Sequence, residues 1–182
     1  MSFTQQGYGQ IQIFTGNGKG KTSAALGEVI RTIGAGKKVG IVYFDKGGSH
    51  YSERSVLDRL SGVQYIVTGR DRIDPITGRF DFSITQEDKE EGRRGLKAVE
   101  EMFLNKIDLV VMDEINSCVG LHIVDVNDVC ELIQHKPEGT ELILTGRNAS
   151  KDLMDLATLV TEMVMQKHYY YAGVKAREGL DF

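Results

Sequence analysis

A glycine-rich segment near the start of the chain has the residue types and spacing of a phosphate-binding loop. It consists of Gly16, Asn17, Gly18, Lys19, Gly20, Lys21 and Thr22. An apolar run precedes it at residues 11–15, and a helical pattern covers 20–35. Glycines let successive N–H groups turn toward phosphate oxygens, and the first turn of a helix adds its unpaired N–H groups. We therefore expect the segment to bind a nucleotide, with Lys21 on its phosphates and the Thr22 hydroxyl on Mg²⁺.

This loop is one residue shorter than the usual form, G-x-x-x-x-G-K-[ST]. Counting back from Gly20, the first glycine of that form would stand at Thr15, whereas this chain has its glycine at Gly16. The triphosphate is therefore expected to sit differently from that of an ordinary ATPase. A plain glycine-rich surface turn is the alternative, but such a turn has no structural need for a lysine where a helix begins.

Two acids, Asp113 and Glu114, directly follow an apolar run at residues 107–112. In proteins with a phosphate loop, an acid at the end of such a strand holds Mg²⁺ directly or through water. A strand that simply ends in a polar turn is the alternative reading. The pairing with a phosphate loop favours a metal role, with Glu114 as a ligand and Asp113 as a ligand or support.

Three weaker candidates also follow apolar runs. Lys46 could meet a phosphate or a carboxylate, or be a solvated turn lysine, and Arg70 is a candidate of the same kind. Arg147 could point into a ligand crevice and stabilise phosphate charge, or lie on the surface after a turn glycine; its position supports the two equally.

Apolar runs alternate with helical patterns along the chain. The runs are 11–15, 39–44, 63–67, 107–112 and 141–145, and the helical patterns are 20–35, 52–60, 85–105, 126–135 and 150–157. Near-continuous apolar strands are typical of a parallel sheet covered on both faces. The pattern predicts one nucleotide-binding α/β domain over residues 1–182, a P-loop NTPase-like three-layer sandwich with a mostly parallel central sheet. Ligands then bind at the carboxyl ends of the strands, where all the candidate residues fall.

Two features concern the long helical pattern at 85–105. Thr85 and Asp88 have the spacing of a capping box at its start. Gly92 and Gly95 cost helix stability, roughly 1 kcal/mol each relative to alanine. They either permit a close approach of a neighbour or ligand, or are merely tolerated.

Bulk composition excludes several classes of function. The chain has 22 basic and 26 acidic residues, a net charge of -4, which argues against nucleic acid or an anionic membrane as the main partner. Its first six residues do not have the order of a signal peptide, and no apolar run is long enough to span a bilayer, so a cytoplasmic protein is expected. Cys118 and Cys130 do not have the spacing of a redox or zinc motif, which predicts two free thiols.

Over nearly its whole length the sequence resembles the ATP:cob(I)alamin (corrinoid) adenosyltransferases of the phosphate-loop type. The matching motifs are T-G-N-G-K-G-K-T at 15–22, K-G at 46–47, D-E-I-N at 113–116, T-G-R-N at 145–148, T-E-M at 161–163, K-H at 167–168 and G-V-K-A-R-E-G-L-D-F at 173–182. Their order and spacing are together highly specific. The resemblance implies transfer of the 5′-deoxyadenosyl group of ATP to the cobalt of reduced cobalamin, which forms adenosylcobalamin and releases triphosphate.

The resemblance also implies roles for individual residues. Cob(I)alamin is itself a strong nucleophile, so the protein needs no nucleophile or general base of its own. Lys21, Glu114 and Arg147 would then serve catalysis by holding ATP and Mg²⁺, and Glu114 would serve the metal rather than activate water. Lys46, Lys167 and His168 are further candidates on the matching motifs.

Partners follow from the same resemblance. It implies a homodimer and a corrinoid bound without its lower axial ligand. The density of Phe and Tyr beside glycines makes 63–82 or 168–182 the candidates for the apolar wall at that position. Nothing in the sequence resembles a flavin or iron–sulfur site and the two cysteines are poorly placed for redox work, so the electron is expected from a separate protein such as a flavodoxin or ferredoxin. Because the loop begins at Gly16, the cover over the corrinoid is expected from the partner subunit, the 70–84 loop or the C-terminal segment. The alternatives are an ordinary ATPase or kinase that acts at the γ-phosphate, and a non-enzymatic corrinoid carrier or regulator.

Overall fold

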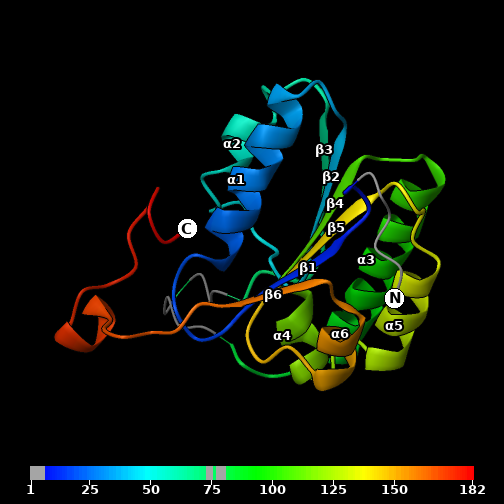
Figure 1. Ribbon diagram of the computed structural model, residues 1–182. Helices are drawn as coiled ribbons and strands as arrows, with labels where there is room; N and C mark the ends of the chain where they lie inside the picture. Colours follow the sequence, from blue (N-terminus) through cyan, green and yellow to red (C-terminus); the bar gives the residue numbers. More distant parts are fainter. Residues whose placement is uncertain (1–6, 73–75, 77–80) are drawn as a thin grey trace.

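The computed structural model describes residues 7–72, 76 and 81–182, and these residues form one six-stranded sheet with helices on both faces (Figure 1). The strands are β1 (Ile11–Thr15), β2 (Val39–Tyr43), β3 (Val63–Val67), β4 (Leu109–Asp113), β5 (Glu141–Thr145) and β6 (Leu159–Glu162). All neighbours pair in parallel, in the order β3-β2-β4-β5-β1-β6. This arrangement confirms the predicted P-loop NTPase-like α/β class.

The helices form the outer two layers. They are α1 (Lys21–Gly34), α2 (Arg54–Leu57), α3 (Gln86–Leu104), α4 (Ile115–Gly120), α5 (Val126–Gln134) and α6 (Lys151–Leu156), followed by a short 3₁₀ helix, η1 (Tyr169–Ala172). Helices α1 and α2 cover one face of the sheet, and α3 to α6 cover the other (Figure 1). Within the described residues, no helix combines the length and apolar character needed to cross a membrane.

Alternate residues of each central strand enter two separate cores. In β4, Leu109 and Val111 pack in the core beneath α1, whereas Val110 and Met112 pack in the core beneath α3 and α5. Every residue of β4 is buried as a result. A strand that is covered on both faces must be apolar at every position, which explains the unbroken apolar runs in the sequence.

Some elements differ from the sequence prediction. Strand β6 and helix α4 were not predicted, because β6 is a short edge strand with all four residues exposed and α4 is too short to show a helical period. Helix α2 covers only Arg54–Leu57 of the predicted 52–60, and β4 runs one residue further than predicted, to Asp113. The capping box of Thr85 and Asp88 is confirmed.

The C-terminal segment returns to the edge of the sheet where the parallel strands end. After β6 it passes through η1 and comes back toward the start of α1 (Figure 1). The Ser52 hydroxyl donates to the Phe182 carbonyl oxygen at 3.1 Å, which holds the end of the chain against the loop after β2. The described residues leave out 1–6, 73–75 and 77–80. Two sequence predictions fall partly on these residues, namely the lack of a signal peptide and the 70–84 loop as a cover.

The two glycines of α3 lie at close contacts with the rest of the protein. A Cβ on Gly95 would stand 2.4 Å from Cε1 of the buried Phe44 ring, and one on Gly92 would stand 2.8 Å from Cγ2 of Val124. The glycines therefore permit close packing of α3, which was one of the two alternatives that the sequence left open.

Gly95→Ala is expected to destabilise the protein despite the higher helix propensity of alanine. The gain of roughly 1 kcal/mol in propensity is outweighed by overpacking against Phe44, which costs about 1–3 kcal/mol. Gly27→Ala in α1 is the matched control, since nothing lies within 4 Å of its added Cβ. Urea denaturation should show Gly95→Ala less stable than wild type and Gly27→Ala equally or more stable; a stabilised Gly95→Ala would contradict the packing argument.

Candidate nucleotide and metal site

The backbone of the glycine-rich loop packs directly against the chain that follows β6. The Gly18 N–H donates to the Met163 carbonyl oxygen at 2.7 Å, and a Cβ on Gly18 would stand 2.6 Å from that same oxygen. Gly16 and Gly20 have φ of 96° and 121°, a region that strongly favours glycine. The Met165 N–H donates to the Asn17 side-chain oxygen at 3.0 Å. The loop is therefore fixed in shape before any ligand binds.

Lys21 begins helix α1, which has no side-chain cap and no acidic residue in its first turn. Its ammonium is buried and donates to the Gly18 carbonyl oxygen at 2.7 Å. Burial lowers the pKa of Lys21, and the nearby positive charge of Arg147 lowers it further. The N-terminus of a helix together with a buried lysine forms a site suited to an anion such as phosphate.

Asp113 is the centre of the polar contacts at this edge of the sheet. It is 1% exposed, and its Oδ1 accepts hydrogen bonds from the hydroxyls of Thr22 at 2.9 Å and Thr145 at 2.6 Å. Its Oδ2 accepts from the Lys46 ammonium at 2.5 Å. Residues from β4, β5, α1 and the loop after β2 thus meet on one carboxylate.

Glu114 turns the chain sharply at the end of β4, with φ of 65°. Its N–H donates to the Thr145 hydroxyl at 3.0 Å, and its Oε2 accepts from the Ser117 hydroxyl at 2.6 Å. Its Oε1 lies 3.7 Å from the Lys46 ammonium. These contacts hold the half-buried carboxylate between the Ser117 hydroxyl and the Lys46 ammonium.

The oxygens that the sequence predicted as metal ligands converge here. Thr22, Asp113 and Glu114 all lie around the Lys46 ammonium, and Thr22 Oγ1 is 3.1 Å from it. A hydroxyl and two carboxylates are donors that suit Mg²⁺, which takes its remaining ligands from phosphates and water. No group of three or more His, Cys, Asp or Glu residues suited to a metal is found in the described part of the chain.

Lys46 meets the carboxylates of Asp113 and Glu114, one kind of partner that the sequence left open for it. Burial alone would lower its pKa, but the negative charges of Asp113 and Glu114 raise it above the ordinary value, so the side chain is an ammonium. The Lys46 N–H donates to the Thr68 carbonyl oxygen at 3.0 Å, and its own carbonyl oxygen accepts from the Arg54 guanidinium at 2.6 Å.

The C-terminal segment contacts the loop through Lys19. The Lys19 ammonium lies 2.5 Å from both Asp181 Oδ1 and the Leu180 carbonyl oxygen, and it donates to the Tyr169 hydroxyl at 3.2 Å. Tyr169 also donates to Asp181. The Lys19 ammonium, together with the Tyr169 hydroxyl, holds the pKa of Asp181 well below its usual range, so this carboxylate stays charged.

Two cavities flank this contact. One, of about 250 Å³, is lined by the loop, Lys21, Arg147, His168 and Tyr169. The other, of about 570 Å³, is lined by Thr22, Lys46 and Glu114 together with the last residues of the chain. Arg147 and His168 are therefore beside the loop, whereas Lys167 is exposed. The Arg147 N–H donates to the Ser117 hydroxyl at 2.9 Å, which links it to the Glu114 turn.

Comparison with known proteins decides the family. The model of the ATP:corrinoid adenosyltransferase family BtuR/CobO/CobP matches residues 7–182. The chain belongs to this family. This match confirms the resemblance that the sequence motifs indicated.

The sequence also matches individual relatives along most of their length. The chain is 35% identical over 176 residues to the corrinoid adenosyltransferase of Escherichia coli strain K12, covering 96% of this chain and 86% of the relative. It is 36% identical over 183 residues to the corrinoid adenosyltransferase CobA of Salmonella typhimurium, covering 98% and 88%. It is 33% identical over 176 residues to the corrinoid adenosyltransferase of Pseudomonas aeruginosa, covering 96% and 84%.

In this member of the corrinoid adenosyltransferases, some residues of the site were not singled out from the sequence. Thr145 and Ser117 orient the two acids, and Asp181 and Tyr169 hold Lys19. Thr145 and Asp181 belong to the family motifs at 145–148 and 173–182, which could have marked them as site residues. Their place beside the loop is evident only in the folded chain. Ser117 carried no signal of its own.

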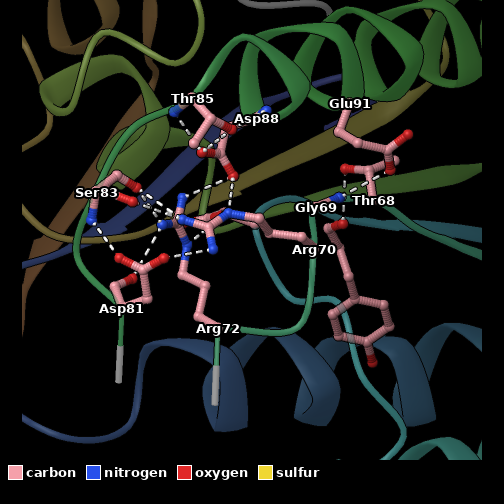
Figure 2. A network of polar contacts seen from close by, with 11 residues as sticks. Thr68, Gly69, Arg70, Arg72, Asp81, Ser83, Thr85, Asp88 and Glu91 are labelled. Atoms are coloured by element: carbon pink, nitrogen blue, oxygen red, sulfur yellow. Dashed lines mark hydrogen bonds and ion pairs between the residues drawn. The ribbon is translucent and has the colours of Figure 1, made fainter. Parts of the chain in front are cut away.

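Arg70 lies in an ionic network and meets a carboxylate, which is one of the partners that the sequence left open for it. Figure 2 shows Arg70 and Arg72 converging on Asp88 at the start of α3. Arg70 Nε lies 3.1 Å from Asp88 Oδ1, and Arg72 Nη2 lies 3.1 Å from the same oxygen. Arg72 Nε also donates to Asp45 Oδ1 at 2.7 Å. Because Asp45 directly precedes Lys46, this network fixes the loop that carries Lys46.

Arg72→Ala is expected to destabilise the protein by roughly 3 kcal/mol, because it leaves the buried carboxylate of Asp88 and the half-buried carboxylate of Asp45 short of a counter-charge. Burial would raise the pKa of Asp88, but hydrogen bonds from Thr85 and the charges of Arg72 and Arg70 hold it below the ordinary value. The contribution of Arg72 through Asp88 is therefore present above the ordinary carboxyl pKa and lost as the pH falls below it.

Denaturation of Arg72→Ala at neutral and acidic pH checks this expectation, with the loss of stability shrinking at acidic pH. Arg93→Ala, at an exposed arginine on α3, is the control and should stay within about 0.5 kcal/mol of wild type. Equal stabilities of the two variants would rule out a structural role for the network.

Proposed function

We propose that this chain transfers the 5′-deoxyadenosyl group of ATP to the cobalt of reduced cobalamin or a related corrinoid, which forms adenosylcobalamin and releases triphosphate. The proposal is carried by one observation: a family match that spans the phosphate loop, the acid pair and the C-terminal segment. The convergence of Thr22, Asp113 and Glu114 beside the loop supports it.

In this reaction the electron pair of Co(I) attacks ribose C5′. That pair forms the cobalt–carbon bond, so the cobalt becomes formally Co(III). The C5′–oxygen bond breaks, and triphosphate leaves with the bonding electrons of that bond. No proton has to be removed from a nucleophile, so the protein needs no general base. Its task is to hold the leaving group, orient C5′ toward the cobalt and exclude water.

The residues of the site divide this task among them. The backbone of Gly16, Asn17, Gly18, Lys19 and Gly20 receives the triphosphate, and Lys21 places a charge on it. Thr22 and Glu114 hold Mg²⁺, with Asp113 as their support. When bound, Mg²⁺ neutralises part of the triphosphate charge. Arg147 lies beside the smaller cavity with Lys21 and stabilises the charge that develops as the carbon–oxygen bond breaks. His168 lines the same cavity, while Lys167 stays a candidate without an assigned contact.

Other properties belong to the same proposal. We infer one domain over residues 1–182, a cytoplasmic location, a homodimer, and a flavodoxin or ferredoxin as the electron source. Burial raises the pKa of the Cys118 thiol, and burial also raises that of Cys130, so neither is poised for redox chemistry. A separate reductant is consistent with these inert thiols.

Anaerobic incubation with ATP, Mg²⁺ and chemically reduced cobalamin should yield adenosylcobalamin and triphosphate. Lys21→Ala should lower the rate or the ATP affinity about ten- to a hundredfold, since it removes a charged hydrogen bond worth roughly 1.5–3 kcal/mol. Lys151→Ala, at an exposed lysine of α6, is the control and should behave as wild type. Release of orthophosphate without adenosylcobalamin would instead favour the ordinary ATPase.

Glu114→Gln should shift the Mg²⁺ dependence of the rate to higher concentration, because an amide is a weaker ligand than a carboxylate. The measurement is the initial rate against Mg²⁺ at fixed ATP. Glu131→Gln on the exposed side of α5 leaves the curve unchanged. If Glu114→Gln kept full activity at limiting Mg²⁺, the metal role of Glu114 would have to be abandoned.

A further inference from the structure

The Lys46 ammonium stands at the point where the proposed Mg²⁺ ligands converge. It is 2.5 Å from Asp113 Oδ2, 3.1 Å from Thr22 Oγ1 and 3.7 Å from Glu114 Oε1. A cation with these three oxygen neighbours occupies the environment that a divalent ion would need. The three oxygens therefore share a cation that the chain itself supplies.

We propose that Lys46 is an internal counter-ion that fills the Mg²⁺ position in the absence of nucleotide and gives it up when Mg²⁺ enters with ATP. The inference rests on the proposed metal site and adds to it a residue that couples metal binding to nucleotide binding. Lys46 is here a positioning residue, because it acts through the ligands of the metal.

Charge explains why Lys46 and the metal exclude one another. Asp113 and Glu114 together carry two negative charges, and Lys46 neutralises one of them. A divalent ion added beside the ammonium would bring three positive charges to two carboxylates in a largely buried place, where Lys46 has a side-chain exposure of 13%. Free metal therefore has to displace the ammonium, whereas metal that arrives with a triphosphate brings the compensating negative charge.

The surroundings of Lys46 allow the ammonium to move while the backbone stays in place. Hydrogen bonds to Thr68 and from Arg54 hold the backbone of Lys46, and the network of Arg72 and Asp45 holds the residue before it. The flexible side chain ends at a cavity of about 570 Å³ that Thr22 and Glu114 also line. On leaving the carboxylates, the ammonium has room in this cavity, beside the position proposed for the phosphates.

A simple structural pairing of Lys46 with Asp113 is the competing explanation, and it predicts a different result. Removal of Lys46 would then cost stability and leave metal binding as it was. Under the proposal, removal opens the site to a divalent ion without nucleotide. Metal binding in the absence of ATP therefore separates the two explanations, and it is a readout that does not depend on activity.

Mn²⁺ is the probe, since its free aqueous ion is measured directly by electron paramagnetic resonance. Without nucleotide, Lys46→Met should bind Mn²⁺ at least about tenfold more tightly than wild type, because the competing cation is gone. Lys46→Arg keeps a cation and should remain like wild type. Lys37→Met, at a lysine paired with Asp108 on the opposite end of the sheet, is the matched control. Lys46→Gln keeps a donor toward Asp113 and replaces the methionine variant if that variant does not fold.

The coupling between ligands gives a second measure. In wild type, ATP should tighten Mn²⁺ binding strongly, and in Lys46→Met the same addition should have a smaller effect, because the displacement of Lys46 no longer has to be driven by nucleotide. The double variant Lys46→Met with Glu114→Gln should lose the gained Mn²⁺ binding, which places the ion at this site.

Two failures are distinguishable. If Glu114→Gln leaves Mn²⁺ binding with ATP unchanged, the proposed metal site itself is wrong. If Glu114→Gln weakens that binding, but neither Lys46→Met nor Lys46→Gln binds Mn²⁺ better than wild type without nucleotide, then the site stands and the counter-ion role of Lys46 is overturned.

Discussion

The organisation of this site depends on a buried carboxylate at the end of a doubly covered strand. Asp113 ends β4, and a charge at that depth is costly unless every oxygen is hydrogen-bonded and a counter-charge lies near. Thr22, Thr145 and Lys46 meet this need, and each comes from a different part of the chain. The requirement to satisfy one carboxylate therefore fixes the start of α1, the end of β5 and the loop after β2 relative to one another.

The same constraint explains why the loop does not rearrange freely. Thr22 is tied to Asp113 in the helix that the loop opens, while Gly18 is tied to Met163 beyond β6. The loop is thus held in its middle by the chain beyond the edge strand and at its end by the central strand β4. A phosphate-binding backbone that is rigid before binding loses little conformational entropy when the ligand arrives, which favours tight and oriented capture of a leaving group.

The sequence predicts the fold well where one physical requirement dominates. Strands that are buried on both faces must be apolar throughout, so β2, β4 and β5 are evident, and the spacing of Lys21 and Thr22 after glycines identifies the loop. The exposed edge strand β6 has no such requirement and was missed.

What the sequence could not give is the pairing of distant charges. Lys46 and Arg70 each had a phosphate or a carboxylate as a possible partner, and in the fold they join Asp113 and Asp88. An ion pair leaves no periodic trace in the chain, since only the fold decides which carboxylate a lysine or arginine can reach. For the same reason the contact of Lys19 with Asp181 was not foreseen, although the motifs that hold both residues were recognised.

These pairings reduce the repulsion between the cations of the site. A triphosphate leaving group needs several cations nearby, yet cations gathered around an empty loop would repel one another. In the structure, Lys19 is paired with Asp181, Lys46 is paired with Asp113, and Lys21 donates to a loop carbonyl oxygen. The chain thus assembles its positive charges beforehand by giving them partners of its own. A polyanion that brings more negative charge than any single carboxylate would compete well for those cations.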